Sequence, residues 1–168
     1  MRWLVDGYNV IRRDAELRDR ESTGLEAGRA GLLALVAGVA REVSDDFIVV
    51  FDGARRVGAA PAGGRVQVMF SRPPETADDV LRRLAATYRE GGVVVTSDRA
   101  VLDSARRVGA VGVSGEAFLT AVRRRASGGD PDEDEEDDDE PERRGGPRHR
   151  LPREARAAGR VLRRLAGR

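Results

Sequence analysis

Aspartates stand at or just after the ends of short apolar runs in this sequence. Asp6 and Asp52 directly follow two such runs, and Asp98 comes three residues after a third. Asp78 and Asp79 fall in the first turn of a predicted helix that precedes the third run. The carboxyl ends of parallel strands share one edge of a sheet, where ligands bind. We therefore expect these carboxylates to gather at one edge.

Each aspartate by itself also fits an ordinary structural role. Asp-Gly is common turn chemistry, which covers Asp6 and Asp52. Asp98 could cap a helix, and Asp78 and Asp79 could favour a helix dipole. Several carboxylates at one edge repel one another unless they bind a cation. The joint pattern therefore predicts a functional acidic cluster.

Carboxylate oxygens and retained water are the ligands that Mg²⁺ and Mn²⁺ prefer. A bound metal of this kind can activate water and stabilise the charge that builds on a phosphate oxygen. The chain has no cysteine and no lysine, and its one histidine, His149, lies far outside the apolar part. Thiolate sites, lysine bases and histidine triads are thereby disfavoured, and metal-assisted phosphodiester hydrolysis is the chemistry that remains. Asn9 could orient the attacking water or a phosphate.

The elements that would position these residues follow from hydrophobic periodicity. Helical spacing predicts helices over 25–43, from Thr76 up to the Gly91-Gly92 pair, over 99–108 and from Ser114 onward. Apolar runs predict strands at 3–5, 48–51, 65–70, 93–95 and 110–113, the third of them nearer the sheet edge. This order predicts an α/β fold, with a mostly parallel sheet and helices on both faces.

Charge divides the chain into three parts. Residues 1–127 are predicted to form one domain. Residues 128–142 are predicted to be a disordered acidic linker, because 130–142 hold eleven acids and no base. Residues 143–168 hold ten arginines and one acid, and are expected to be a tail that becomes helical on contact. The tail could bind RNA through counterion release while the acidic run competes with the RNA. A solubilising linker with a non-specific basic end is the alternative.

Four motifs resemble those of one known family. Asp6-Gly7-Tyr8-Asn9-Val10-Ile11 is similar to the first motif of NYN domains, relatives of the PIN nucleases. The three that follow in the family's order are Val50-Phe51-Asp52-Gly53, Glu75-Thr76-Ala77-Asp78-Asp79 and Val95-Thr96-Ser97-Asp98. The set looks like the YacP-like branch, which includes a bacterial ribosome-associated endonuclease that cleaves mRNA. The resemblance covers residues 1 to about 125.

This resemblance implies a Rossmann-like PIN fold, a bound Mg²⁺ or Mn²⁺, and cleavage of RNA, with mRNA and the ribosome as partners. It places the family's acidic residues at Asp6, Asp52, Asp78 and Asp98, with Asp79 as a further metal ligand and Asn9 at the asparagine position. Arginines flanking the site in sequence could contact RNA phosphates. These are Arg12, Arg13, Arg55, Arg56, Arg72 and Arg99.

A second function class fits the same residues. The chain could be an RNA- or ribosome-binding module with this fold and little or no catalysis. No signal peptide is apparent, and no stretch approaches the ~20 apolar residues of a membrane span, so a cytoplasmic location without membrane contact is expected.

Overall fold

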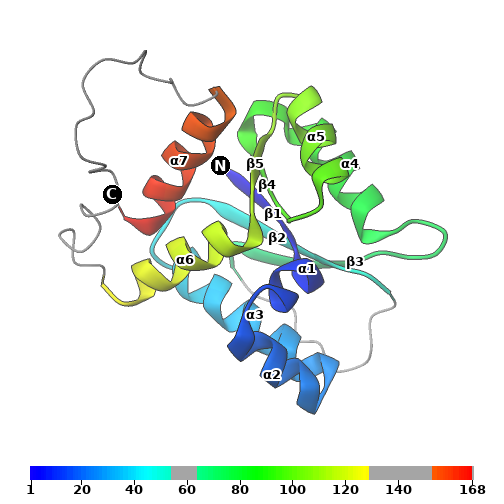
Figure 1. The fold of residues 1–168 in the computed structure, drawn as a ribbon, viewed down its shortest axis with the longest axis vertical. Coiled ribbons are helices and arrows are strands. Elements are labelled where there is room, and N and C mark those ends of the chain that lie inside the picture. Colours follow the sequence, from blue (N-terminus) through cyan, green and yellow to red (C-terminus); the bar gives the residue numbers. More distant parts are fainter. Residues whose placement is uncertain (54–63, 129–152, 168) are drawn as a thin grey trace, which may run out of the picture.

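A five-stranded parallel sheet forms the centre of the molecule (Figure 1). The computed structural model describes residues 1–53, 64–128 and 153–167. The strand order is β3-β2-β1-β4-β5, so the mostly parallel sheet expected from the sequence is confirmed, with β3 at one edge. The strands are β1 (Arg2–Asp6), β2 (Asp46–Phe51), β3 (Val66–Phe70), β4 (Gly92–Val95) and β5 (Val111–Val113).

Helices cover both faces of this sheet, as expected. Those of the described residues are α1 (Gly7–Arg12), α2 (Ala15–Thr23), α3 (Leu25–Ala40), α4 (Ala77–Tyr88), α5 (Arg99–Arg107), α6 (Gly115–Ala126) and α7 (Arg153–Ala166), with a 3₁₀ turn, η1 (Arg89–Gly91), after α4. The predicted helix over 25–43 ends at Ala40. The short helix α1 and the polar helix α2 are additions that periodicity did not indicate.

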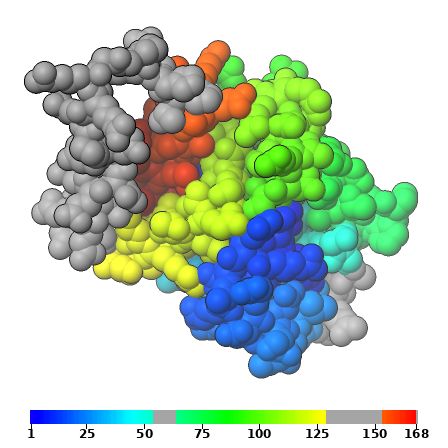
Figure 2. All heavy atoms as spheres, in the orientation of Figure 1, coloured from blue at the N-terminus to red at the C-terminus, as the bar shows by residue number. Residues whose placement is uncertain are grey.

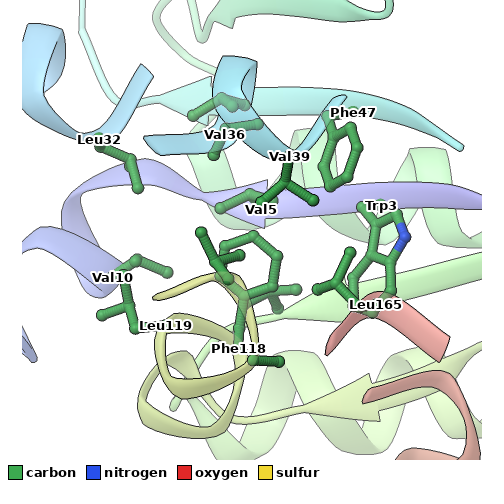
Figure 3. Close-up of a cluster of buried hydrophobic side chains, with 14 of the residues drawn as sticks. Trp3, Val5, Val10, Leu32, Val36, Val39, Phe47, Phe118, Leu119 and Leu165 are labelled. Atoms are coloured by element: carbon green, nitrogen blue, oxygen red, sulfur yellow. The ribbon is translucent and has the colours of Figure 1, made fainter. Parts of the chain in front are cut away.

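The side chains on the two faces of β1 belong to two separate apolar clusters, because successive side chains of a strand point to opposite sides. Trp3 and Val5 lie in the larger cluster, which α1, α2, α3, α6 and α7 complete (Figure 3). Leu4 lies in the smaller cluster, under α4 and α5. All three side chains are essentially inaccessible to solvent. A sheet buried on both faces needs the near-continuous apolar runs that the sequence shows.

Side-chain caps begin most of these helices. Asp6, Asp14, Thr76, Asp98 and Ser114 each accept a hydrogen bond from the backbone N–H three residues on, in the first turn of the helix they precede. Asp98 therefore forms the cap that was its alternative role, and Ser114, where the last helix was predicted to begin, caps α6. Asp6 and Asp98 carry a structural role, which does not remove them from the sheet edge.

Helix α7 corrects the expectation for the end of the chain. The arginine-rich tail was expected to lie outside the domain and to be able to form a helix on contact, whereas residues 153–166 form a helix that packs on α6 and β5. Val161 and Leu165 are buried in the same cluster as Trp3, which explains the docking in terms of apolar area removed from water. The acidic linker from residue 129 onward, and residues 143–152, lie outside the described residues.

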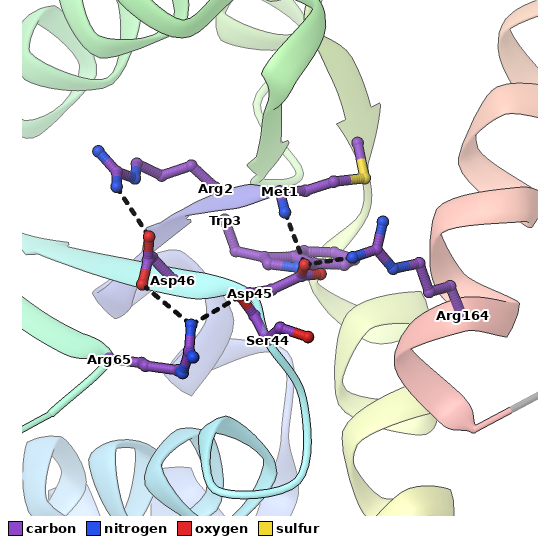
Figure 4. Close-up of polar contacts among 8 residues, drawn as sticks. All are labelled: Met1, Arg2, Trp3, Ser44, Asp45, Asp46, Arg65 and Arg164. Atoms are coloured by element: carbon purple, nitrogen blue, oxygen red, sulfur yellow. Dashed lines mark hydrogen bonds and ion pairs between the residues drawn. The ribbon is translucent and has the colours of Figure 1, made fainter.

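A buried carboxylate fixes α7 to the amino edge of the sheet (Figure 4). Asp45 accepts hydrogen bonds from the N-terminal ammonium of Met1 at 2.6 Å, from the indole of Trp3 at 3.0 Å and from Arg164 at 2.6 Å. Burial acts to raise the pKa of Asp45, but these donors and charges outweigh it, so the pKa is lowered. Arg125 of α6 also donates to the Leu165 carbonyl oxygen at 3.1 Å.

Within the described ranges, none of the helices has both the length and the apolar character needed to cross a membrane.

Candidate active site at the carboxyl edge of the sheet

The expected aspartates lie at the carboxyl ends of three neighbouring strands. Asp6 is the last residue of β1, Asp52 follows β2, and Asp98 lies three residues after β4. Because β1 lies between β2 and β4 in the sheet, Asp6 is the central member. Asp78 is the second residue of α4, which begins at the same edge after β3. The exposed fraction falls to 8% at Asp6, whereas Asp52 is exposed.

Thr96 links the ends of β1 and β4. Its hydroxyl donates to Asp6 Oδ2 at 2.9 Å and accepts from the backbone N–H of Asp98 at 3.2 Å. The other carboxylate oxygen of Asp6 accepts from the Asn9 N–H at 3.2 Å. Thr96 itself is fully buried. One hydroxyl therefore holds both the central carboxylate and the turn that carries Asp98.

Asn9 closes this network from α1. Its side-chain oxygen accepts from the Ser97 N–H at 2.8 Å, so the amide NH₂ is the group left to donate outward. This hydrogen bond links α1 directly to the segment after β4. Ser97 also contacts Glu116 through its hydroxyl, at 3.3 Å.

Ser71 is a site residue that the sequence reasoning missed. Its hydroxyl donates to Asp52 Oδ1 at 2.5 Å and accepts from the Gly53 N–H at 3.1 Å. Only 1% of Ser71 is exposed. Its signal in the sequence is its place directly after a strand, the position that Asp52 occupies after the neighbouring strand. Ser71 orients Asp52 as Thr96 orients Asp6.

The pKa values of Asp6 and Asp78 are both raised, and charges of neighbouring aspartates contribute to each. Burial is the main cause that raises the pKa of Asp6, and the charge of Asp78 adds to it against the hydrogen bonds from Asn9 and Thr96. Burial also raises the pKa of Asp78, with repulsion from Asp98, Asp79 and Asp52 behind it and Arg82 opposing. Asp78 of α4 therefore lies close enough to Asp6, Asp52 and Asp98 for their charges to repel it.

Arg82 supplies a counter-charge that the sequence reasoning also missed. Its guanidinium lies 3.7 Å from Asp78 Oδ2 and 3.3 Å from Asp79 Oδ1. The spacings of four and three residues along α4 are the available signal, since such pairs are neighbours on a helix surface. Arg82 is half-exposed, so this pairing offsets only part of the repulsion at Asp78.

Asp79 is used in the cap of α4. Its Oδ2 accepts from the backbone N–H of Thr76 at 3.1 Å and from the Thr76 hydroxyl at 2.9 Å, while Thr76 caps the Asp79 N–H. This is a reciprocal capping box. The capping hydrogen bonds lower the pKa of Asp79. Its carboxylate is directed to its own helix, and we do not retain it among the metal ligands.

The donor set suits a hard cation that keeps its water. Across residues 1–53, 64–128 and 153–167, no three Asp, Glu, His or Cys side chains are grouped to enclose a metal. Mg²⁺ is usually held through one or two carboxylates plus waters and substrate phosphates, so a full protein cage is not required. Carboxylates that repel one another around the buried Asp6 fit such a cation, since a bound positive charge relieves the repulsion.

The structure divides the predicted RNA-contacting arginines. Arg12 lies near enough to Asp6 for its charge to lower the pKa of that carboxyl, and Arg72 and Arg99 are exposed beside Ser71 and Asp98. Arg13 is 3.4 Å from Glu116, with both side chains half-exposed. The two predicted contacts at 55 and 56 lie outside the described residues.

Tyr8, in the first motif, is packed into the fold. Its hydroxyl accepts two hydrogen bonds from Arg29, one from Nε at 2.8 Å, and its ring meets Phe51 edge-on at 5.2 Å. The Arg29 guanidinium lies over the rings of Tyr8, Phe51 and Phe70. Arg29 is 6% exposed, and within the described residues its NH1 has no hydrogen-bond partner.

The fold and the edge cluster together define an α/β domain with an acidic site at the carboxyl ends of its strands. The model of the YacP-like NYN domain family matches residues 3–164. The chain therefore belongs to this family of PIN-like nuclease domains, as the four motifs indicated. The match runs past residue 125, where the resemblance was expected to end, and takes in most of α7.

Proteins of Bacillus subtilis are similar to this chain. YacP of strain 168, described as uncharacterized, is 33% identical over 84 residues, which is 49% of this chain and 49% of that protein. The chain thus spans about half the length of the curated relative it matches. The crystal structure of Rae1 (YacP) superposes with a TM-score of 0.64 at 29% identity, over 73% of this chain and 74% of that one. A single-substitution mutant of Rae1 (YacP) gives a TM-score of 0.61 at 28% identity, over 76% and 82%.

Proposed function

We propose that this chain is a metal-dependent endoribonuclease whose site lies at the carboxyl edge of the sheet. The observation that supports it is the acidic surroundings of Asp78. Burial raises the pKa of this carboxyl, and the charges of Asp98 and Asp52, which follow β4 and β2, raise it further. Like charges brought together from distant parts of the chain cost stability unless they serve a ligand. Membership in a family of PIN-like nucleases agrees with a nucleic-acid ligand.

We assign the metal-binding role to Asp6, Asp52, Asp78 and Asp98. When bound there, Mg²⁺ or Mn²⁺ supplies a water of lowered pKa and neutralises charge on the phosphate that is attacked. Thr96 and Ser71 hold two of these carboxylates in fixed orientation, which reduces the reorganisation needed when substrate arrives.

The remaining side chains of the edge bind and orient the substrate in this proposal. The free NH₂ of Asn9 donates to a phosphate oxygen or to the attacking water. Arg12, Arg72 and Arg99 are exposed around the cluster, and we assign them to phosphates on either side of the bond that is cut. Arg13 is less free, because it pairs with Glu116.

We propose RNA as the substrate class. The test compares free mRNA with mRNA on the translating ribosome, and so determines which of the two is cleaved. The experiment measures endonucleolytic cleavage of both forms in Mg²⁺ or Mn²⁺, comparing the wild type with Asp6→Asn/Asp98→Asn. Asparagine keeps both helix caps, so the fold is expected to survive. Asp19→Asn/Asp103→Asn removes the same charge from exposed positions on α2 and α5 and serves as the matched control.

Cleavage by the wild type and the control, with loss in the site variant, would support the nuclease. Absence of cleavage of either RNA by folded, Mn²⁺-bound wild type would favour the RNA- or ribosome-binding module. Equal cleavage by the site variant would reject these aspartates as the metal site.

A further inference from the structure

Helix α7 carries a row of arginines opposite its buried side. Arg153, Arg156, Arg160 and Arg163 are spaced by three, four and three residues, which places them on one side of an α-helix. All four are exposed, whereas Val161 and Leu165 on the other side are buried. We call these four residues the α7 stripe. Figure 2 shows atoms of α7, orange to red, at the surface on this face of the molecule.

In the part of the chain that the structure describes, the α7 stripe lacks the acidic partners that other arginines of the same region have. Arg123 pairs with Asp14 and Glu16, Arg125 with Glu42, and Arg164 with Asp45. Within the described residues no ion pair joins any of the four stripe arginines to an acid, and the one acid of the helix, Glu154, lies 3.4 Å from Arg106 of α5. Among the described residues the stripe is therefore a positive surface without acidic partners, on a helix that is itself fixed to the core.

A groove runs beside the stripe. It has a volume of about 410 Å³ and lies between α7, α5 and the start of β5. Arg153 and Arg160 of the stripe line it, together with Arg106 and the acids Glu90 and Glu154, and the residues from Gly109 to Gly112 form another part of its wall. Arg106 is paired with Asp103 and Glu154, so Arg153 and Arg160 are the guanidinium groups of the groove that can donate to a phosphate chain. Each can donate two parallel hydrogen bonds to one phosphate.

The stripe lies at the amino ends of the strands, whereas the aspartates lie at the carboxyl ends. Arg164 of α7 binds Asp45, which precedes β2, whereas Asp52 follows β2. The six residues of β2 span roughly 20 Å. A nucleotide bound at the carboxylate edge therefore cannot also reach the α7 stripe.

We propose that the α7 stripe and its groove form a second RNA-binding surface, which takes the sugar-phosphate backbone of long or structured RNA away from the bond that is cut. This inference rests on the proposed function for its choice of RNA over other polyanions. Four guanidinium groups along a docked helix present a fixed row of donors to phosphates, without contacts to bases, so the binding is expected to be independent of sequence.

The test compares Arg156→Gln/Arg160→Gln/Arg163→Gln with Arg18→Gln/Arg20→Gln/Arg41→Gln in the full chain. Glutamine keeps helix propensity close to that of arginine, and the control removes the same charge from exposed positions on α2 and after α3. Affinity for a long structured RNA is measured across salt concentrations, and thermal melting establishes that both variants fold.

For the stripe variant we expect the slope of log K against log salt to become shallower by about two, from three lost phosphate contacts. The affinity is expected to fall on the order of 50-fold at about 0.15 M salt, by the same relation. The control should keep the wild-type slope. Cleavage of an oligonucleotide of about four nucleotides, which occupies only the carboxylate edge, should be unchanged in both variants.

An unchanged slope and affinity in the stripe variant would overturn the proposal. Displacement of the RNA by polyglutamate at equal charge concentration would also overturn it, by showing that the stripe accepts any polyanion, including an acidic peptide. If no variant and no wild type cleaves RNA while the stripe variant still loses RNA affinity, the second surface stands and the proposed nuclease fails.

Discussion

Replacing Thr96 with valine tests whether one buried hydroxyl sets the charge state of the site. Valine has nearly the same shape, so the packing at this fully buried position is kept. The change removes the donor to Asp6 Oδ2 at 2.9 Å and the acceptor for the Asp98 N–H at 3.2 Å. The hydrogen bond from Thr96 opposes the effect of burial on Asp6, so its loss is expected to raise the pKa of Asp6 further.

The magnitude follows from the strength of a charge-assisted hydrogen bond. Such a bond contributes about 1.5–3 kcal/mol, and its loss falls on the ionised form of Asp6, so the pKa of this carboxyl is expected to rise in Thr96→Val. Asp6 is only 8% exposed, so solvent screens this interaction little. If ionised Asp6 is needed for cleavage, the acid limb of the pH–rate profile moves to higher pH together with the pKa of Asp6.

The same change predicts a pH-dependent loss of stability. A carboxyl whose folded-state pKa lies above its unfolded value destabilises the fold when it ionises. The part of the loss that comes from Asp6 should therefore appear as the pH rises through the folded-state pKa of Asp6 in the wild type, and be complete above the higher folded-state pKa in Thr96→Val. Chemical unfolding at several pH values measures this dependence.

Carboxyl-carbon NMR of Asp6 measures the pKa directly and does not depend on activity. Thr96→Ser keeps the hydroxyl and serves as the control, with a profile expected close to that of the wild type. A folded Thr96→Val protein whose Asp6 titrates at the wild-type pH would refute the reasoning, because the hydroxyl would then contribute nothing to the charge state.

The remaining predictions concern α4, α7 and the first motif. Asp78→Asn should raise the melting temperature at neutral pH by removing repulsion, and it should abolish cleavage. Asp79→Asn should lower the melting temperature by weakening the capping box, and it should leave cleavage unchanged. The opposite order of the two melting temperatures would contradict the assignment of roles to these aspartates. Leu165→Ala should cost about 2–5 kcal/mol in urea unfolding with a single transition, and a separate early transition would show that α7 is not part of the cooperative unit. Tyr8→Phe removes the acceptor of two hydrogen bonds from Arg29 and should cost about 1–3 kcal/mol, and Arg29→Met in the same chain should recover part of the loss; no recovery would mean that the buried guanidinium is not the cause.

The sequence by itself determined the strands and the edge at which the aspartates lie. Near-continuous apolar runs that alternate with helices predict parallel strands buried on both faces. A parallel sheet brings the carboxyl ends of its strands together independently of the loop conformations. Asp6, Asp52 and Asp98 could therefore be placed relative to one another from their positions after strands. The caps at Asp98 and Ser114 were equally local, since a cap depends on only three following residues.

Only the tertiary structure decided which oxygen of each side chain is engaged. Asp78 and Asp79 are adjacent and alike in sequence, yet one faces the carboxylate cluster and the other bonds to Thr76. The direction of a helix relative to the sheet separates them, and that direction comes from packing. Ser71 and Thr96 likewise gained their roles from strand pairing across long stretches of chain.

Helix α7 shows the same division most clearly. Its arginine content predicted a tail outside the domain, because charge composition alone describes a segment without its contacts. Val161 and Leu165 contribute little to that composition, but their burial against the cluster of Trp3 decides where the helix lies. Burial of a few apolar side chains outweighs average composition when a complementary surface is available, and the sequence does not display that surface before the chain folds.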